Sequence, residues 1–192
     1  MESTSEPHDT IPTTSFDALS RDIGRVLPGP FRRHLELWQK LRRDRGAPCL
    51  SDLFAASDPV IQPWLVVIDT EQEDTQAIRL VGTGIADFFG FDATGYDFLQ
   101  TVTPDLRKIF VAAHRRMTRD LVGKFHLAVC STSTGRELEV LAFAMPYART
   151  DGRPCAVWML IPGTGLQYGE TGSQVRAILE QRWVQLPLAA AH

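Results

Sequence analysis

The chain has 192 residues, of which 44% are hydrophobic and 22% are charged, and its formal net charge is −3 at pH 7. These proportions are ordinary for globular proteins, so they exclude a wholly disordered chain, a collagen-like repeat and a coiled-coil rod. The balanced charge also argues against direct nucleic-acid binding, for which a basic excess is typical.

Cysteine usage and hydropathy favour a cytoplasmic protein. Cys49, Cys130 and Cys155 are scattered and never spaced as C-x-x-C, which argues against a disulfide scaffold and a structural zinc site. No pair of histidines or cysteines has the spacing of metal ligands, so we expect no metal site. No segment reaches the ~18–20 consecutive apolar residues of a membrane helix, and the acidic N-terminus lacks a secretion signal, so we expect no membrane insertion.

The N-terminal part divides into two segments. Residues 1–30 are acidic with few core-forming residues, so we expect them to be mostly disordered, with a short helix over residues 16–27. Residues 31–64 are expected to form an amphipathic helix over 31–45 and a connector. The apolar residues of this helix form one stripe, namely Phe31, Leu35, Trp38 and Leu41.

Residues 65–162 are expected to form the main domain. The pattern predicts two strands, a cluster of short helices, one longer helix that begins after Thr103, and three more strands. The five strands are expected at residues 65–68, 76–81, 125–131, 137–147 and 155–161. Residues 163–192 are expected to form a linker and a C-terminal helix that is capped by Ser173 and places four apolar residues on one side: Val175, Ile178, Leu179 and Trp183.

This order of elements predicts an α+β fold, in which a five-stranded antiparallel sheet has the central short helices on one face. The late strands are apolar on both faces, whereas a sheet with one wet face would show polar residues at every second position. The second face must therefore also be covered. Either the amphipathic helix over 31–45 covers it, or a second subunit does.

The chain resembles the PAS domain, and most closely a family of short, stand-alone bacterial PAS proteins that lack an effector domain. The resemblance covers roughly residues 31–162 and depends on the order of elements and on four short stretches. These are Leu37-Trp38, IRLVGT at 78–83, FFG at 88–90 and DATG at 92–95. The resemblance implies a sensor or interaction module built around a small apolar cavity; it implies no catalysis and names no ligand.

Aromatic and apolar residues from several elements converge on one face of the expected sheet and are our candidates for the lining of such a cavity. They are Phe88, Phe98, Phe110, His114, Met117, Leu127 and Trp158. A fully packed core is the alternative for the same residues. His126 is expected on the strand face opposite Phe125 and Leu127, in a structural role.

The sequence gives no sign of an enzyme, since it has no G-x-S-x-G, H-E-x-x-H or P-loop motif. Our first hypothesis is a non-enzymatic sensory or regulatory domain that binds a small apolar or amphipathic ligand and signals through a partner protein. The second is a ligand-free adaptor that forms a homodimer through the sheet face and Phe31, Leu35, Trp38 and Leu41. The third is a haem sensor with His114 as axial ligand. No cofactor is assigned.

Charge is segregated along the main domain. Residues 66–105 hold eight acids and one base, whereas residues 107–124 hold six bases and one acid. Beyond solvated faces, such patches can steer a protein partner or a second copy of the chain.

Overall fold

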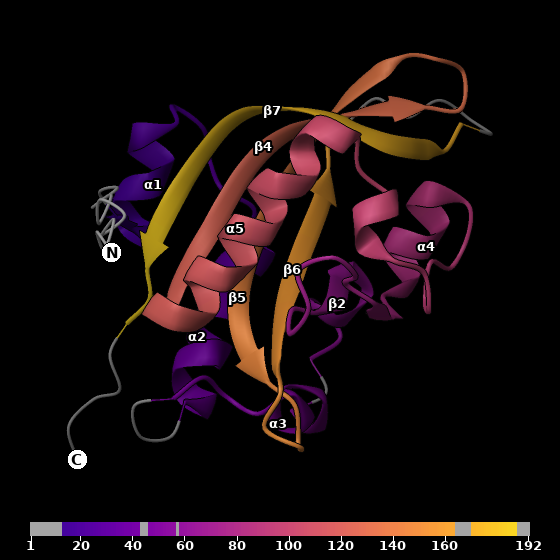
Figure 1. Cartoon of the computed structure of the whole chain (residues 1–192). Helices are drawn as coiled ribbons and strands as arrows, with labels where there is room; N and C mark the ends of the chain where they lie inside the picture. The colour runs from indigo at the N-terminus through magenta and orange to yellow at the C-terminus, as the bar shows by residue number, and fades with distance from the viewer. Residues whose placement is uncertain (1–12, 43–45, 57, 164–169, 188–192) are drawn as a thin grey trace, which may run out of the picture.

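A curved seven-stranded sheet forms the centre of the computed structural model, which describes residues 13–42, 46–56, 58–163 and 170–187 (Figure 1). The strands lie in the order β1-β7-β4-β5-β6-β2-β3. Their bounds are Thr13–Ser15 (β1), Leu65–Asp69 (β2), Ile78–Val81 (β3), Val122–Thr132 (β4), Glu137–Ala148 (β5), Pro154–Pro162 (β6) and Gly172–Gln185 (β7). Neighbouring strands are antiparallel except β1 and β7, which are parallel. The α+β class is confirmed, but the expected sheet of five antiparallel strands is wrong, because the sheet is larger and mixed.

Helices cover both faces of this sheet. In Figure 1, α5 (Pro104–Asp120) crosses the face toward the viewer, and α4 (Thr83–Phe89) lies to its right. The opposite face packs against α1 (Phe16–Asp22), α2 (Gly29–Leu41) and α3 (Leu50–Ala55). Two short 3₁₀ turns, η1 (Gln62–Trp64) and η2 (Phe98–Gln100), precede β2 and α5.

The central strands contribute side chains to two separate cores, because successive side chains of a strand point to opposite faces of the sheet. In β5 and β6, Phe143, Met145, Val157 and Met159 join the core under α1, α2 and α3. Their neighbours Ala142, Ala144, Ala156 and Trp158 join the core under α5. The doubly apolar pattern of the late strands therefore reflects a sheet that is covered on both sides by its own chain.

The amphipathic helix expected over residues 31–45 is α2, which ends at Leu41; residues 43–45 lie outside the described residues. Phe31 and Trp38 are fully buried against the sheet, and the Trp38 indole nitrogen donates a hydrogen bond to the Pro146 carbonyl at 2.8 Å. Leu35 is also buried, and the half-buried Leu41 packs on the same core. The expectation that this stripe forms an interface between two copies needs correction, because its side chains are used to cover the chain's own sheet.

The N-terminal segment is more ordered than its composition indicates. Residues 1–12, expected to be disordered, lie outside the described residues, but β1 pairs with the end of β7. The Ser15 hydroxyl caps α1 by accepting a hydrogen bond from the Ala18 amide at 3.2 Å. The helix expected over 16–27 is thus present but ends at Asp22.

The expected C-terminal helix is wrong, because residues 172–185 form β7 along the edge of β4. The register between these strands shifts at three places, including Leu127/Ala128 and Val129/Cys130. Each irregularity changes which residues of the strand face the core, so the apolar residues lose their period of two. The remaining spacing of three or four residues mimics the stripe of an amphipathic helix.

Three buried histidines are distributed over the two cores. His34 lies on the α2 side, with its Nε2 atom 3.1 Å from the Tyr147 hydroxyl, whereas His114 and His126 lie on the α5 side. Burial lowers the pKa of His34 and of His114 to about 3. Burial, with smaller effects of Lys124 and His114, lowers the pKa of His126 well below its ordinary value. All three imidazoles are therefore neutral in the folded protein.

The free energy of unfolding is expected to fall on acidification. Because these pKa values are lower in the folded than in the unfolded state, the stabilisation is complete above pH ~6.5 and is lost as the pH falls toward about 3. From about pH 7.5 to about pH 5, urea denaturation should show a loss of about 2 kcal/mol for each of His34 and His114, with a further loss from His126. His34→Gln should remove about 2 kcal/mol of this loss. A free energy of unfolding that stays level over this range would contradict the burial of neutral imidazoles.

Candidate functional site

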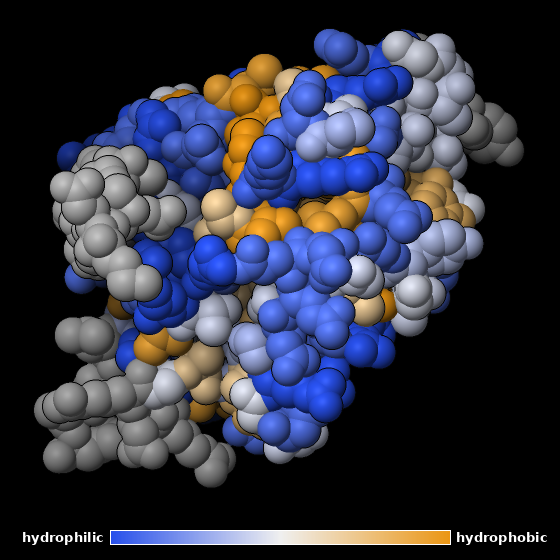
Figure 2. Space-filling view, viewed as in Figure 1, coloured by the Kyte–Doolittle hydropathy of each residue, from blue (hydrophilic) through white to orange (hydrophobic). Residues whose placement is uncertain are grey.

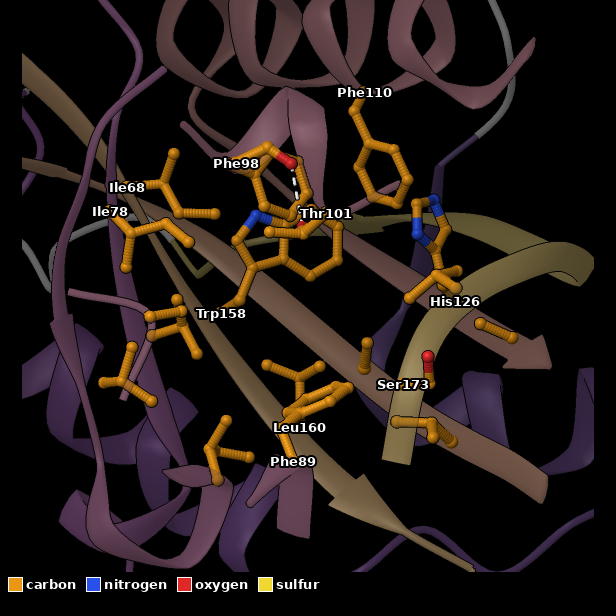
Figure 3. Close-up of a pocket in the computed structure, with 18 of the residues that line it drawn as sticks. Ile68, Ile78, Phe89, Phe98, Thr101, Phe110, His126, Trp158, Leu160 and Ser173 are labelled. Carbon is orange, nitrogen blue, oxygen red and sulfur yellow. Dashed lines mark hydrogen bonds between the residues drawn. The ribbon is translucent and has the colours of Figure 1, made fainter. Parts of the chain in front are cut away.

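A partly open cavity of about 100 Å³ lies between the sheet and the helices of the α5 side (Figure 3). Its walls come from β2, β3, α4, η2, α5 and the inner face of strands β4 to β7. The lining is almost entirely apolar and aromatic. Among the lining residues are Ile68, Ile78, Phe89, Phe98, Thr101, Phe110, His126, Trp158, Leu160 and Ser173.

Small side chains on the sheet leave the space open. Ala128 of β4 and Ala142 of β5 line the cavity floor, where larger residues would fill it. At one end, the start of β7 approaches α4 so closely that a Cβ on Gly172 would lie 2.4 Å from the Phe88 ring. Glycine at this position therefore lets β7 approach α4 and line the cavity, to which it contributes Ser173 and Val175.

His126 is the most unusual group of the lining. It is 1% exposed, and its Nε2 atom has no hydrogen-bond partner among the described residues. The ring is held by aromatic neighbours, with its centroid 5.3 Å from that of Phe110 and 5.2 Å from that of Trp158. Since buried polar atoms are nearly always paired, this imidazole is an available polar group in an otherwise apolar chamber.

The other polar groups of the lining are weaker candidates. The Thr101 hydroxyl already donates to the Phe98 carbonyl at 2.8 Å, the bond drawn in Figure 3. Ser173 of β7 lies on the same side of the cavity as His126 in Figure 3, but it is exposed, so water is available to its hydroxyl.

A buried chain of hydrogen bonds leads outward from the cavity wall. The Trp158 indole nitrogen donates to His114 Nε2 at 2.8 Å. This nitrogen is therefore the acceptor, and Nδ1 carries the proton that is donated to the Gln76 side-chain oxygen at 2.7 Å. Gln76 is itself buried, and its backbone amide donates to Asp97 at 3.0 Å. Trp158 is thus linked through α5 to the residues that precede β3.

The structure brings only some of the predicted lining residues to the cavity. Phe98, Phe110 and Trp158 line it, and the rings of Phe110 and Trp158 lie 5.7 Å apart. Met117 is buried in the same core, and His114 is buried beside Trp158, but neither lines the cavity; Phe88 packs in a neighbouring cluster. The expectation that Leu127 lines the cavity needs correction, because this residue belongs to the core under α1, α2 and α3.

Sequence reasoning missed three kinds of lining residue. His126 and Ala128 lie on the β4 face opposite Leu127, and the alternation alone does not tell which face is inward. Phe89 lines the cavity where its neighbour Phe88 was expected, since a short helix gives little periodicity. Ser173 and Val175 were missed because β7 was taken for a helix.

Within the described ranges of the chain, clustered metal-ligating groups and cysteines are absent from the cavity lining. Among the described residues, no cluster of three or more His, Cys, Asp or Glu side chains could hold a metal ion. Burial raises the pKa of Cys130 and raises that of Cys155 to about 12, so both thiols remain protonated and unreactive. None of the described helices is long and apolar enough to span a bilayer.

Comparison with known proteins identifies the family. No curated protein matches the chain. A family model described as the PAS domain matches residues 29–160, from the start of α2 nearly to the end of β6. Because this match covers more than half of the chain, the chain belongs to the PAS domain family.

Proposed function

We propose that this PAS domain is a non-enzymatic sensory or regulatory module that binds a small, uncharged and largely apolar molecule in the cavity beside His126. A sensory or regulatory role agrees with its family. The observation that carries the ligand proposal is the apolar cavity in which the Nε2 atom of the buried His126 has no hydrogen-bond partner among the described residues. A ligand with one hydroxyl or carbonyl group would bury its apolar part and supply that partner.

The volume limits the size of the ligand. The cavity of about 100 Å³ is of the same order as the ~150 Å³ engineered apolar cavities that take up benzene. It therefore suits a single ring or a short branched chain. Haem and flavin are far larger, and His114 has both ring nitrogens in hydrogen bonds to Trp158 and Gln76. These two observations disfavour the haem sensor.

A ligand-free adaptor is less well supported. That hypothesis depends on a sheet with a second apolar face that a partner could cover. In the structure this face packs against α1, α2 and α3 of the same chain. Homodimerisation through Phe31, Leu35 and Trp38 would require exposing side chains that are buried in the chain's own core.

Signalling would pass through Trp158. This residue forms part of the cavity wall and donates to His114 on α5. A ligand that shifts the indole ring changes this bond, and with it the contact of α5 with Gln76. The two arrangements of α5 would present different surfaces to a protein partner.

The ligand proposal predicts that phenol binds more tightly than benzene. Both rings are of similar size, but only the phenol hydroxyl can pair with the His126 imidazole. One such hydrogen bond corresponds to about a tenfold difference in Kd. Titrations followed by two-dimensional NMR should show this preference in the natural chain and its loss in His126→Leu. Equal affinities for the two compounds in the natural chain would overturn the role of His126.

A cavity-filling variant provides the matched test of location. Ala128→Leu places apolar atoms in the cavity and should abolish binding of both compounds. Ala55→Leu, on the exposed end of α3, should leave binding unchanged. Retention of full binding in Ala128→Leu would show that the cavity is not the site.

The signalling route predicts that binding and its effect on Gln76 can be separated. Trp158→Phe keeps an aromatic ring in the wall but leaves His114 Nε2 without its donor, at a cost of about 1–3 kcal/mol in stability. Phenol should still bind to this variant. The shift of the Gln76 side-chain amide resonance on phenol addition, present in the natural chain, should disappear. An unchanged shift would exclude this route.

A further inference from the structure

We infer a second ligand site, a surface groove between α5 and β7 that takes an elongated amphipathic carboxylate, with its head group at Lys124. This site is separate from the internal cavity and does not depend on the function proposed for it. The groove has a cationic end at Lys124 and an apolar end at Ile109 and Leu179.

Lys124 of β4 is 3% exposed, although it carries an ammonium group. Its Nζ atom lies 4.0 Å from the centroid of the Trp183 ring, and the Arg116 guanidinium lies 4.3 Å from the same centroid. Within the part of the chain that the structure describes, no carboxylate forms an ion pair with Lys124. A nearly buried ammonium that is held by an aromatic ring beside a second cation favours the arrival of an anion.

The electrostatics of Lys124 agree with this geometry. Burial, and secondly the neighbouring Arg116, lower the pKa of the ammonium to about 8. The two arginines of this region have partners of their own, since Arg116 pairs with Asp120 at 3.4 Å and Arg182 with Glu180 at 2.5 Å. Lys124 is therefore the cation that one external negative charge would satisfy.

The groove continues from Lys124 toward the apolar end, where Glu180, Gln181 and Arg182 add polar surface beside the apolar side chains. Arg116, Lys124 and Trp183 line the first part, and Leu106, Ile178 and Leu179 line the second. Both parts share Ile109, Gln181 and Arg182, so they form one continuous groove.

The apolar end is unusually exposed. Ile109 is 39% exposed and Leu179 is 56% exposed. Figure 2 shows apolar surface among the charged side chains on this face of the molecule. A ligand that lies along this end would cover apolar surface that now faces water.

Dimensions and charge together select the ligand class. From Leu106 to Arg116, α5 spans roughly 15 Å, which matches a medium-length acyl chain laid along the helix. Glu180 lies at the apolar end and disfavours a second negative charge there. The groove therefore fits a molecule with a single carboxylate at one end and an alkyl chain behind it, oriented with the carboxylate at Lys124.

The test compares decanoate with decanol, below their aggregation limits, by isothermal titration calorimetry on the full chain. Decanoate should bind saturably, and decanol at least tenfold more weakly. Lys124→Met keeps an unbranched apolar side chain but removes the charge, and it should weaken decanoate binding at least tenfold. Lys108→Met, at an exposed position of α5, should leave the affinity unchanged. Thermal unfolding of both variants verifies that they are folded.

Two further measurements distinguish other occupants. Ala128→Leu fills the internal cavity and should leave decanoate binding intact. Loss of binding in this variant would mean that the alkyl chain of decanoate enters the cavity, which would overturn the groove site. Sedimentation velocity should give the same mass with and without decanoate. A dimer that excludes decanoate would assign the groove to a second copy of the chain. Absence of decanoate binding, or equal binding by Lys124→Met, would also overturn the proposal.

Discussion

The two apolar faces of the central sheet are the constraint on which the rest of the structure depends. Apolar surface on both sides must be removed from water, and the chain supplies a separate cover for each side. On one side, α1, α2 and α3 form a dense layer in which Phe31, Trp38 and Phe143 are fully buried. On the other side, α5 lies over alanines, and the cover leaves a cavity. The difference between the two covers explains why one face is structural and the other is suited to binding.

The position of β7 determines the character of both candidate sites. By extending the sheet beyond β4, it brings Ser173 and Val175 to the cavity and Arg182 and Trp183 to the groove. It also provides the edge on which β1 pairs, which ties the N-terminal segment to the sheet. A fold that ended at β6 would lack the part of the cavity wall that Ser173 and Val175 form, and the Lys124 ammonium would lack its aromatic neighbour.

The sequence was informative where one periodicity dominates a segment. The strands of the main domain and the start of α5 after Thr103 were predicted because alternation and helix-capping residues are local signals. The choice between Leu127 and His126 as the inward residue depends on how β4 is placed against other elements, which no local pattern contains. The prediction of a helix in place of β7 was wrong for a different reason, since the irregular pairing of β7 with β4 removes the alternation of apolar residues. The cavity floor was missed because alanine at positions 128 and 142 carries no signal until its neighbours are known.

The two proposed sites share α5 as a common wall, and this arrangement would couple ligands that bind to them. Phe110 faces the cavity from the inner side of the helix, whereas Ile109 and Arg116 face the groove from its outer side. A ligand in the cavity would act on α5 through the hydrogen bond from Trp158 to His114, and a ligand in the groove would act on the same helix from outside. If each ligand prefers one position of α5, the effect of either on the affinity of the other must be equal, because coupling free energies are reciprocal. A single helix between two chemically different ligands would allow the domain to respond to their combination. A partner protein would then bind according to the position of α5.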